Sequence, residues 1–364
     1  MIGYGGFGTF LHHWWAKMDN IEVAAIAYLE HPPENAGGCR TYDDWHDLLA
    51  DKDIDIVSIA TPPGLHAEMA CAAMRAGKHV LLEKPAAVTE EGLRQLLETQ
   101  QETGMAVTVN HMIRCNPIIQ HLRQIGQSGA FGRLRHATVN NYAQDESLPP
   151  GHWFWDEAQS GGIMVEHGVH FFDIINALGG EHPIKVCGLS HSRNASQRDR
   201  VAASVLYDQG LVASYYHAFS GPGFFEKTAI TLAYDRARVE IQGWIPLQGT
   251  AEAITDPASR ILLEGLPGWQ SAKEEPIAGI TDSSRPEGWG ATELPVQDTA
   301  QPNQGKTLLS GTFQLQASKG DVYGASVQAI LADLVRKIED PAHAMAVTLE
   351  DAVEAVRTAL LATS

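Results

Sequence analysis

The sequence of 364 residues lacks paired cysteines, an excess of basic charge and long apolar runs. Its cysteines form no C-x-x-C pair and are spread over the chain: Cys39, Cys71, Cys115 and Cys187. Such cysteines are typical of reduced thiols in the cytoplasm, not of disulfides or zinc ligands. The formal net charge is −18, whereas nucleic acids and anionic membranes attract basic proteins. We therefore expect neither nucleic acid nor a membrane as a partner. No apolar run is long enough to cross a bilayer, and we expect a cytoplasmic protein.

A glycine-rich loop opens the chain. Residues 3–8 read G-Y-G-G-F-G, the G-x-G-x-x-G spacing with which a tight turn brings backbone amides close to a pyrophosphate. Helically spaced apolar residues follow, so the amide end of a helix would face the phosphates. Only Met1 and Ile2 precede the loop, although such a loop normally follows a buried strand. We therefore expect a truncated first strand and a natural protein that begins upstream, where any export signal would lie.

Patterns of strands and helices alternate through the first third of the chain. Near-continuous apolar stretches, typical of parallel strands covered on both faces, predict strands at 21–27, 54–60, 80–82 and 105–109. Helical patterns lie between them, which favours a doubly wound sheet. Residues 1–115 are therefore predicted to form a dinucleotide-binding Rossmann domain.

The pattern changes after about residue 115. Longer alternating stretches at 134–142, 184–191, 201–207, 211–219 and 228–241 are joined by short turns, which predicts an open, mostly antiparallel sheet. Helices are expected at 117–127, 162–178, 322–338 and 349–361, with loops and short edge strands over 257–320. Residues 116–364 are thus predicted to form an α+β domain for substrate binding and oligomerisation.

Five segments in order along the chain resemble the family of glucose–fructose oxidoreductase and inositol dehydrogenase. Besides the glycine loop, they are TPPGLH (61–66), EKP (83–85), VNHMIRCNP (109–117) and GGIMVEHGVHFFD (161–173). The resemblance covers nearly the whole chain and is specific for the family, not for a substrate. It implies NAD or NADP as cofactor and hydride transfer at a hydroxyl or keto group of a small-molecule sugar, cyclitol or related polyol.

The resemblance gives catalytic roles to Lys84, Glu166 and His170. Glu166 and His170 are four residues apart on a predicted helix, so both would leave the same face, where the carboxylate could orient the imidazole and raise its basicity. His170 would accept the hydroxyl proton. Lys84 would polarise the reacting oxygen or take part in the proton relay. An ordinary pair on the surface of a helix is the alternative for Glu166 and His170.

Eleven residues are expected to hold the cofactor by the same resemblance: Gly3, Gly5, Gly6, Phe7, Gly8, Tyr28, Glu30, Thr61, Pro62, His66 and Glu83. Family members that prefer NAD often carry an acidic residue at the tip of the second strand, where this chain has Tyr28. Glu30 would favour NAD by repelling a phosphate, provided that it reaches the ribose. The choice between NAD and NADP therefore stays open.

Four further residues are candidates for substrate contacts. Trp153 and Trp155 would project together from an extended segment and stack on a sugar ring, or else pack at a domain seam. Arg114 would bind substrate or tie strand to loop. His167 stands beside Glu166, but one helix cannot aim residues 166, 167 and 170 at one ion with equal ease, so a contact with substrate or a structural role is expected and no metal.

Two rival functions remain beside a sugar or polyol dehydrogenase. One is a dihydrodiol-type dehydrogenase. The other is a dinucleotide-binding regulator without turnover, like the galactose-pathway repressors that resemble this family, but such proteins tend to lose the lysine or the histidine that this chain keeps. An open sheet needs cover, so a homodimer or homotetramer is expected.

Overall fold

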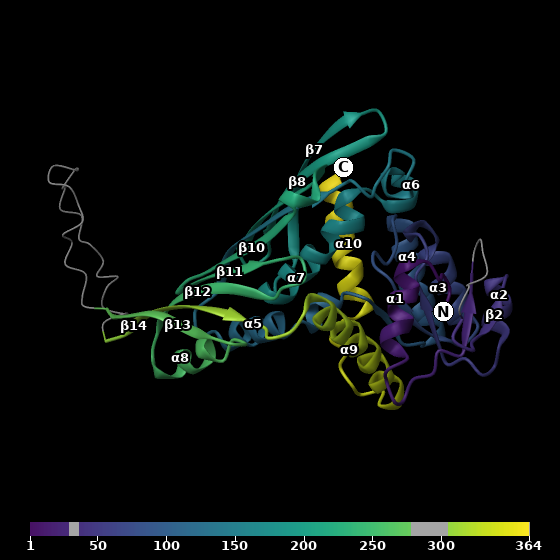
Figure 1. The fold of residues 1–364 in the computed structure, drawn as a ribbon, viewed down its shortest axis with the longest axis horizontal. Coiled ribbons are helices and arrows are strands. Elements are labelled where there is room, and N and C mark those ends of the chain that lie inside the picture. The colour runs from purple at the N-terminus through teal and green to yellow at the C-terminus, as the bar shows by residue number, and fades with distance from the viewer. Residues whose placement is uncertain (29–35, 278–304, 364) are drawn as a thin grey trace.

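The computed structural model describes residues 1–28, 36–277 and 305–363, so the predicted cofactor residue Glu30 lies outside the described residues. Figure 1 shows two bodies side by side: a smaller one around the N-terminal sheet, and a long twisted sheet built from later residues. The two C-terminal helices lie between them. Within the described ranges, no helix is both long enough and apolar enough to cross a membrane.

The N-terminal sheet is parallel, as predicted. Across the sheet its segments are β2 (Arg40–Tyr42), β1 (Ala25–Ala27), the bridging residue Ile2, β3 (Ile56–Ile59), β4 (His79–Leu82) and β5 (Val107–Val109). Ile2 is fully buried and pairs in parallel with Ala27 and Ile59. The amino group of Met1 donates to the carbonyl oxygen of Ala25 over 2.7 Å. These two residues therefore connect β1 to β3 at the centre of the sheet.

Helices join these strands in the order expected of a doubly wound sheet. They are α1 (Gly6–Trp15), α2 (Trp45–Ala50), α3 (His66–Arg75) and α4 (Glu90–Thr103). The ends of α4 show why this segment is helical: the Thr89 side chain accepts from the amide of Gly92, and Gly104 follows with φ +69°. Thr89 is an ordinary N-cap that starts the helix, and Gly104 in the left-handed region is an ordinary stop signal.

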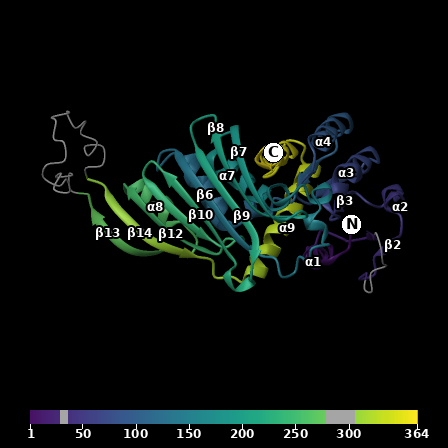
Figure 2. The same ribbon diagram turned by 90° about the horizontal axis from the view of Figure 1, so that it is seen from above.

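The second sheet has nine strands among the described residues (Figure 2). Across the sheet they are β13 (Gln270–Pro276), β14 (Thr307–Gln314), β12 (Gln248–Thr255), β11 (Ala237–Gln242), β10 (Lys227–Tyr234), β6 (Leu134–Gln144), β9 (Val212–Gly221), β8 (Gln197–Tyr207) and β7 (Pro183–Asn194). All described neighbours are antiparallel except β6 and β9, which run parallel. The predicted mostly antiparallel sheet is confirmed.

Three parts of this sheet differ from the prediction. The stretch 228–241 forms two strands, β10 and β11, because the chain turns at Asp235 and Arg236. The segment 257–320, predicted as loops and short edge strands, contains the helix α8 (Pro257–Glu264), which Asp256 caps. Strand β12 was missed because its buried positions are small residues that give little hydrophobic contrast. Residues 278–304 lie outside the description.

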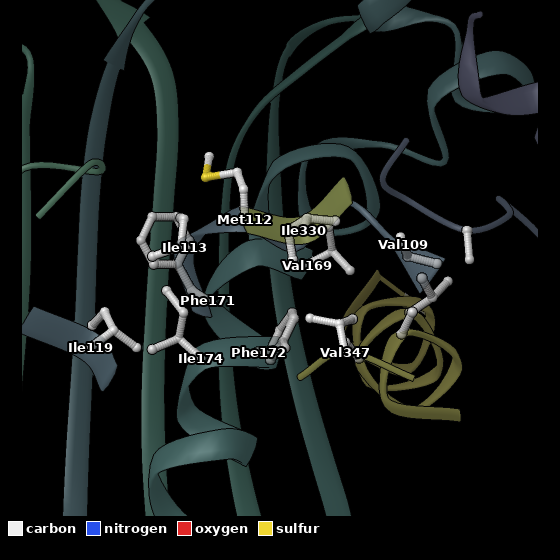
Figure 3. Packing of buried hydrophobic residues seen from close by; sticks show 14 of the residues in the cluster. Val109, Met112, Ile113, Ile119, Val169, Phe171, Phe172, Ile174, Ile330 and Val347 are labelled. Atoms are coloured by element: carbon white, nitrogen blue, oxygen red, sulfur yellow. The ribbon is translucent and has the colours of Figure 1, made fainter. Parts of the chain in front are cut away.

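Helices cover one face of the long sheet (Figure 1). They include α5 (Pro117–Ser128), α7 (Val169–Gly179) and α10 (Leu349–Thr363). Figure 3 shows apolar side chains where the two bodies meet, among them Met112, Phe172, Ile330 and Val347, each at most 2% exposed. One apolar core therefore continues from the first sheet to the second.

The helix α9 (Lys319–Glu339) packs on the N-terminal body although it follows the second sheet in the sequence. The indole nitrogen of Trp15 donates to Val327 O over 3.3 Å, and Gln328 Nε2 donates to Trp14 O over 2.7 Å. The boundary near residue 115 stays a prediction, and the C-terminal helices contact both sides of it.

Candidate active site

The glycine loop forms an open cradle at the start of α1. Gly3 has φ +89°, and a Cβ there would lie 2.6 Å from Ala60 O, while a Cβ on Gly8 would collide with Gly3 O. By contrast, no described atom lies within 4 Å of a Cβ built on Gly5 or Gly6. No described side chain caps the first amides of α1. The residues present therefore fit a dinucleotide, since unpaired helix amides beside a Cβ-free wall suit a pyrophosphate.

Other predicted cofactor residues lie around this cradle. Phe7 packs its ring 5.7 Å from that of Phe10, and Tyr28 follows β1 with its amide bonded to Tyr42 O. Thr61 and Pro62 follow β3 and lead into α3.

His66 lies deeper than a residue in contact with a ligand would. It is fully buried, and its two ring nitrogens lie 2.7 Å from Pro85 O and 2.9 Å from Thr61 O. Burial lowers the pKa of this imidazole to about 4. His66 therefore ties the segment after β3 to the segment after β4.

Lys84, at the end of β4, meets Glu166 from the other half of the chain. Its Nζ donates to Glu166 Oε1 over 2.6 Å and to the Glu166 carbonyl oxygen over 2.9 Å. Their side chains are 17% and 14% exposed. An ammonium group has three N–H donors, so one remains for another acceptor. The contact holds a cation at a defined point between the two bodies.

The predicted pairing of Glu166 with His170 is wrong. Glu166 lies in a π-helical turn, Met164–Gly168, which precedes α7. A π turn carries more residues per turn than an α-helix, so residues four apart no longer share a face. Within the described structure the Glu166 carboxylate bonds to Lys84 and makes no hydrogen bond to His170.

His170 lies among other imidazoles behind this contact. It is 5% exposed, and its ring centroid is 6.2 Å from that of His111 and 6.1 Å from that of His167. Burial, and then the charge of Lys84, lower its pKa well below the usual value. Its Nδ1 has no hydrogen-bond partner in the described part of the chain. The expected rise in the basicity of His170 is therefore wrong: its pKa is lowered, so the imidazole is neutral near neutral pH, in the form that accepts a proton, but is a weaker base than an exposed histidine.

Arg114 is a structural residue here, which corrects its prediction as a substrate contact. Its guanidinium pairs with Asp173 at 2.7 Å and Asp351 at 3.1 Å, and donates to Ala346 O. The Arg114 side chain is 6% exposed. These contacts support the alternative prediction, a structural role. Arg114 joins the turn after β5 to α7 and α10.

The two tryptophans do not project together. Residues Trp153–Trp155 form a 3₁₀ turn, in which neighbours two apart diverge, whereas the prediction needed an extended segment. Trp155 is 8% exposed, and its indole nitrogen donates to Leu148 O. Only Trp153 of the pair lines the cavity described next, so the stacking prediction for Trp155 is wrong.

A cavity of about 300 Å³ lies against Glu166 and His167. This volume is at the low end of the range for small-molecule sites. Its walls come from β6, β9, β10, the π turn and the loop before it, and the lining residues include Asn141, Gln144, Ser147, His152, Trp153, Phe219, Glu226, Thr228 and Trp244. Lys84 reaches the wall through its bond to Glu166, while His170 stands behind His167.

His167 borders the cavity and is not placed as a metal ligand. Burial lowers its pKa to about 3, and its ring packs 5.7 Å from that of His217. In the ranges the structure covers, no group of three or more histidines, cysteines and acids is arranged to hold a metal ion.

Glu83 faces the core rather than the glycine loop. It is 5% exposed and accepts a hydrogen bond from Asn110 Nδ2 over 2.6 Å. Burial raises the pKa of its carboxyl to about 7. Its contacts anchor the end of β4 to the end of β5 and so fix the backbone that carries Lys84.

The sequence reasoning missed several residues that line the cavity: Asn141, Phe219, Thr228 and Trp244. Strict alternation was the available signal for three of them, because Asn141, Thr228 and Phe219 occupy the inward positions of predicted strands. Trp244 follows β11 in a turn, and no periodicity pointed to it.

Two family models match this chain. Residues 1–111 match the model described as "Oxidoreductase family, NAD-binding Rossmann fold", and residues 119–243 match the "GFO/IDH/MocA C-terminal domain". Together they span most of the two bodies, and they meet close to the predicted boundary.

The sequence is similar to characterised enzymes over about half its length. It is 32% identical over 181 residues to 1,5-anhydro-D-fructose reductase of Ensifer adhaerens, covering 48% of this chain and 53% of the relative. It is 31% identical over 165 residues to levoglucosan dehydrogenase of Pseudarthrobacter phenanthrenivorans, covering 44% and 41%. The chain thus spans about half the length of these curated relatives.

The fold is similar over nearly the whole chain to that of a levoglucosan dehydrogenase solved with NADH and levoglucosan. The TM-score is 0.73 with 20% identity, covering 100% of this chain and 95% of the other. At this identity the likeness shows the fold alone.

Proposed function

This chain belongs to the GFO/IDH/MocA oxidoreductase family, and on that premise we propose that it is an NAD(P)-dependent dehydrogenase or reductase acting on a sugar, cyclitol or related polyol. The observation that carries the proposal is the contact of Lys84 with Glu166 at the wall of the cavity. It joins the dinucleotide-binding body to the sheet that forms the small-molecule cavity.

The glycine loop is the part of the proposal that concerns the cofactor. Gly5, Gly6 and the first amides of α1 would hold the pyrophosphate, and the packed Gly3 and Gly8 keep the loop in shape. When bound, the nicotinamide supplies the hydride acceptor or donor. Neither Tyr28 nor its described contacts decides between NAD and NADP.

Lys84 and the side chains around it have separate proposed roles in the transfer of the hydroxyl proton. In the oxidising direction the substrate would lose a hydride from its C–H bond, for which the bound nicotinamide would supply the acceptor, and the O–H proton would pass to a base of this chain. The free N–H of Lys84 would bind the reacting oxygen, and Glu166 would keep the ammonium in place. His170, neutral and buried, is the proposed proton acceptor. His167 would contact substrate at the cavity wall.

Lys84 is bonded to Glu166 at the cavity wall and His170 stands behind His167, and the presence of both residues favours an enzyme over a regulator without turnover. The matched relatives include a reductase and a dehydrogenase of sugar derivatives, which supports the polyol class. A dihydrodiol-type dehydrogenase is the second candidate, since a relative named 1-carboxy-3-chloro-3,4-dihydroxycyclo hexa-1,5-diene dehydrogenase is 28% identical over 206 residues.

The experiment is a substrate panel read by the absorbance of the reduced cofactor. D-Glucose, D-galactose, D-xylose, myo-inositol and levoglucosan are assayed with NAD⁺ and NADP⁺, and 1,5-anhydro-D-fructose with NADH and NADPH. We expect turnover with at least one compound and a clear preference for one cofactor. A cyclohexadiene dihydrodiol is assayed with NAD⁺ and NADP⁺ for the second candidate. Cofactor binding without turnover on any of these compounds would favour the regulator and overturn the proposal.

A further inference from the structure

A polar row crosses three strands at one end of the long sheet. In the register of the sheet, Thr228 of β10 lies opposite Asn141 of β6, which lies opposite His217 of β9. Paired residues point to the same face, here the face that α7 covers. The three residues are 5%, 2% and 0% exposed.

The next row on the same face is almost wholly apolar. Ile230, Val139 and Tyr215 occupy it, and the Tyr215 hydroxyl is bonded to Tyr207. Burial of three polar groups in one row beside these residues is costly unless each finds a partner.

Hydrogen bonds within the row leave some of its polar atoms without a partner. Thr228 Oγ1 donates to Asn141 Oδ1 over 2.8 Å, which fixes the amide and leaves Asn141 Nδ2 without a partner among the described residues. Both ring nitrogens of His217 are unpaired there as well. A buried donor without a partner loses the hydrogen bond that it made to water in the unfolded chain. Something from outside the row is needed to offset this cost.

The row ends at the cavity. Asn141 and Thr228 both line it, opposite Glu166 and His167, and His217 stands behind His167. The lining residues in the described chain include two glutamates, Glu166 and Glu226, and no lysine or arginine. Glu166 is already paired with Lys84, so a carboxylate or phosphate on the ligand would meet the negative charge of Glu226, whereas a hydroxyl can accept from Asn141 and donate elsewhere.

We propose that Asn141, held in place by Thr228, binds a hydroxyl group of an uncharged sugar or cyclitol ring in this cavity. The inference rests on the proposed function and adds to it the residue that reads the substrate and the charge class of that substrate.

The test compares the activity of the wild type and of one variant on a set of related substrates. Asn141→Leu removes the amide at similar size, and it is assayed with the best compound of the panel, its single-deoxy analogues and its uronic acid. Asn176→Leu is the matched control, because Asn176 is also buried with an unpaired Nδ2 but lines no part of this cavity. NADH affinity is measured on each protein.

We expect the wild type to lose about 10–100-fold in kcat/KM on one deoxy analogue, the equivalent of about 1–3 kcal/mol. Asn141→Leu should lose a similar factor on the parent compound and nothing further on that analogue, with unchanged NADH affinity. Asn176→Leu should behave as the wild type. The uronic acid should be at least about tenfold poorer, since its carboxylate would meet the negative charge of Glu226 while Glu166 already occupies Lys84.

Thr228→Val provides a second route should Asn141→Leu not fold, and it should weaken the same discrimination. Two outcomes would contradict the proposal: an equal loss of kcat/KM on all analogues in both variants, or no change of kcat/KM on the parent compound in either variant. Either would mean that buried water alone contacts the row. A higher kcat/KM on the uronic acid than on the parent compound would contradict the proposal that the substrate is uncharged. In each of these cases turnover continues, whereas failure of the proposed function removes turnover from the wild type.

Discussion

At the scale of single residues, the bond of 2.6 Å between Lys84 Nζ and Glu166 Oε1 is the contact on which the proposed chemistry depends. The Glu-Lys-Pro segment after an apolar strand pointed to Lys84, and the spacing of Glu166 and His170 suggested a pair. In the structure the carboxylate of Glu166 accepts a hydrogen bond from Lys84 instead. A π turn decides this, and nothing in a hydrophobic pattern distinguishes a π turn from an α-helical one.

Glu83 carries a prediction about pH. Its folded-state pKa is raised to about 7 by burial, from an unperturbed 4.5. A raised carboxyl pKa contributes stability below the unfolded value, and this contribution is lost as the pH rises through about 7. Glu83→Gln keeps the acceptor for Asn110 and cannot ionise.

The measurement for Glu83 is the free energy of unfolding of both proteins in urea between about pH 5 and pH 8. The variant should gain stability relative to the wild type as the pH rises, by on the order of 3 kcal/mol in full. A difference that stays constant over this range would show that Glu83 ionises as freely in the fold as in the unfolded chain.

At the scale of elements, strong periodicity was the reliable signal. The predicted helices at 322–338 and 349–361 correspond to α9 and α10. β12 was missed because its buried positions are small residues, and α8 was missed because eight residues are too few to show a clear helical period. Arg114 shows the same limit: its partners Asp173 and Asp351 are far along the chain, so only the fold reveals them.

The glycine loop separates a structural requirement from a functional one. Gly8→Ala places a Cβ against Gly3 O, and Gly6→Ala places one in open space at the first turn of α1. We expect Gly8→Ala to unfold at markedly lower temperature. Gly6→Ala should keep its melting temperature within a few degrees and bind NADH at least about tenfold more weakly, because the methyl group would occupy the approach of the pyrophosphate.

Melting curves and NADH fluorescence titration on both variants check this division. Equal NADH affinity for Gly6→Ala and the wild type would contradict the assignment of this loop to the cofactor.

At the scale of the whole molecule, one face of the long sheet bears exposed apolar residues. Leu189 of β7 is 77% exposed, Leu206 of β8 is 38% exposed and Val212 of β9 is 41% exposed, and no described helix covers this face. We propose that a second copy covers it, giving a homodimer or homotetramer as the sequence predicted.

Sedimentation velocity on the wild type should give two or four times 39.5 kDa. Leu189→Lys should shift the protein toward the monomer, because a charge would be buried at the contact. Ile261→Lys is the control, since Ile261 on α8 is 72% exposed and lies outside the proposed interface. A wild-type protein that stays monomeric at micromolar concentration would rule out this assembly.

The convergence of Lys84 and Glu166 from the two bodies is the central claim, and single-turnover hydride transfer tests it most directly. The rate is measured with saturating cofactor and the best compound of the panel for the wild type, for Lys84→Met and, as a control, for Lys52→Met at an exposed position after α2. We predict that Lys84→Met lowers the rate by about 10²–10⁴-fold at unchanged cofactor affinity, while Lys52→Met has no effect. A rate for Lys84→Met within a few-fold of the wild type would contradict the account.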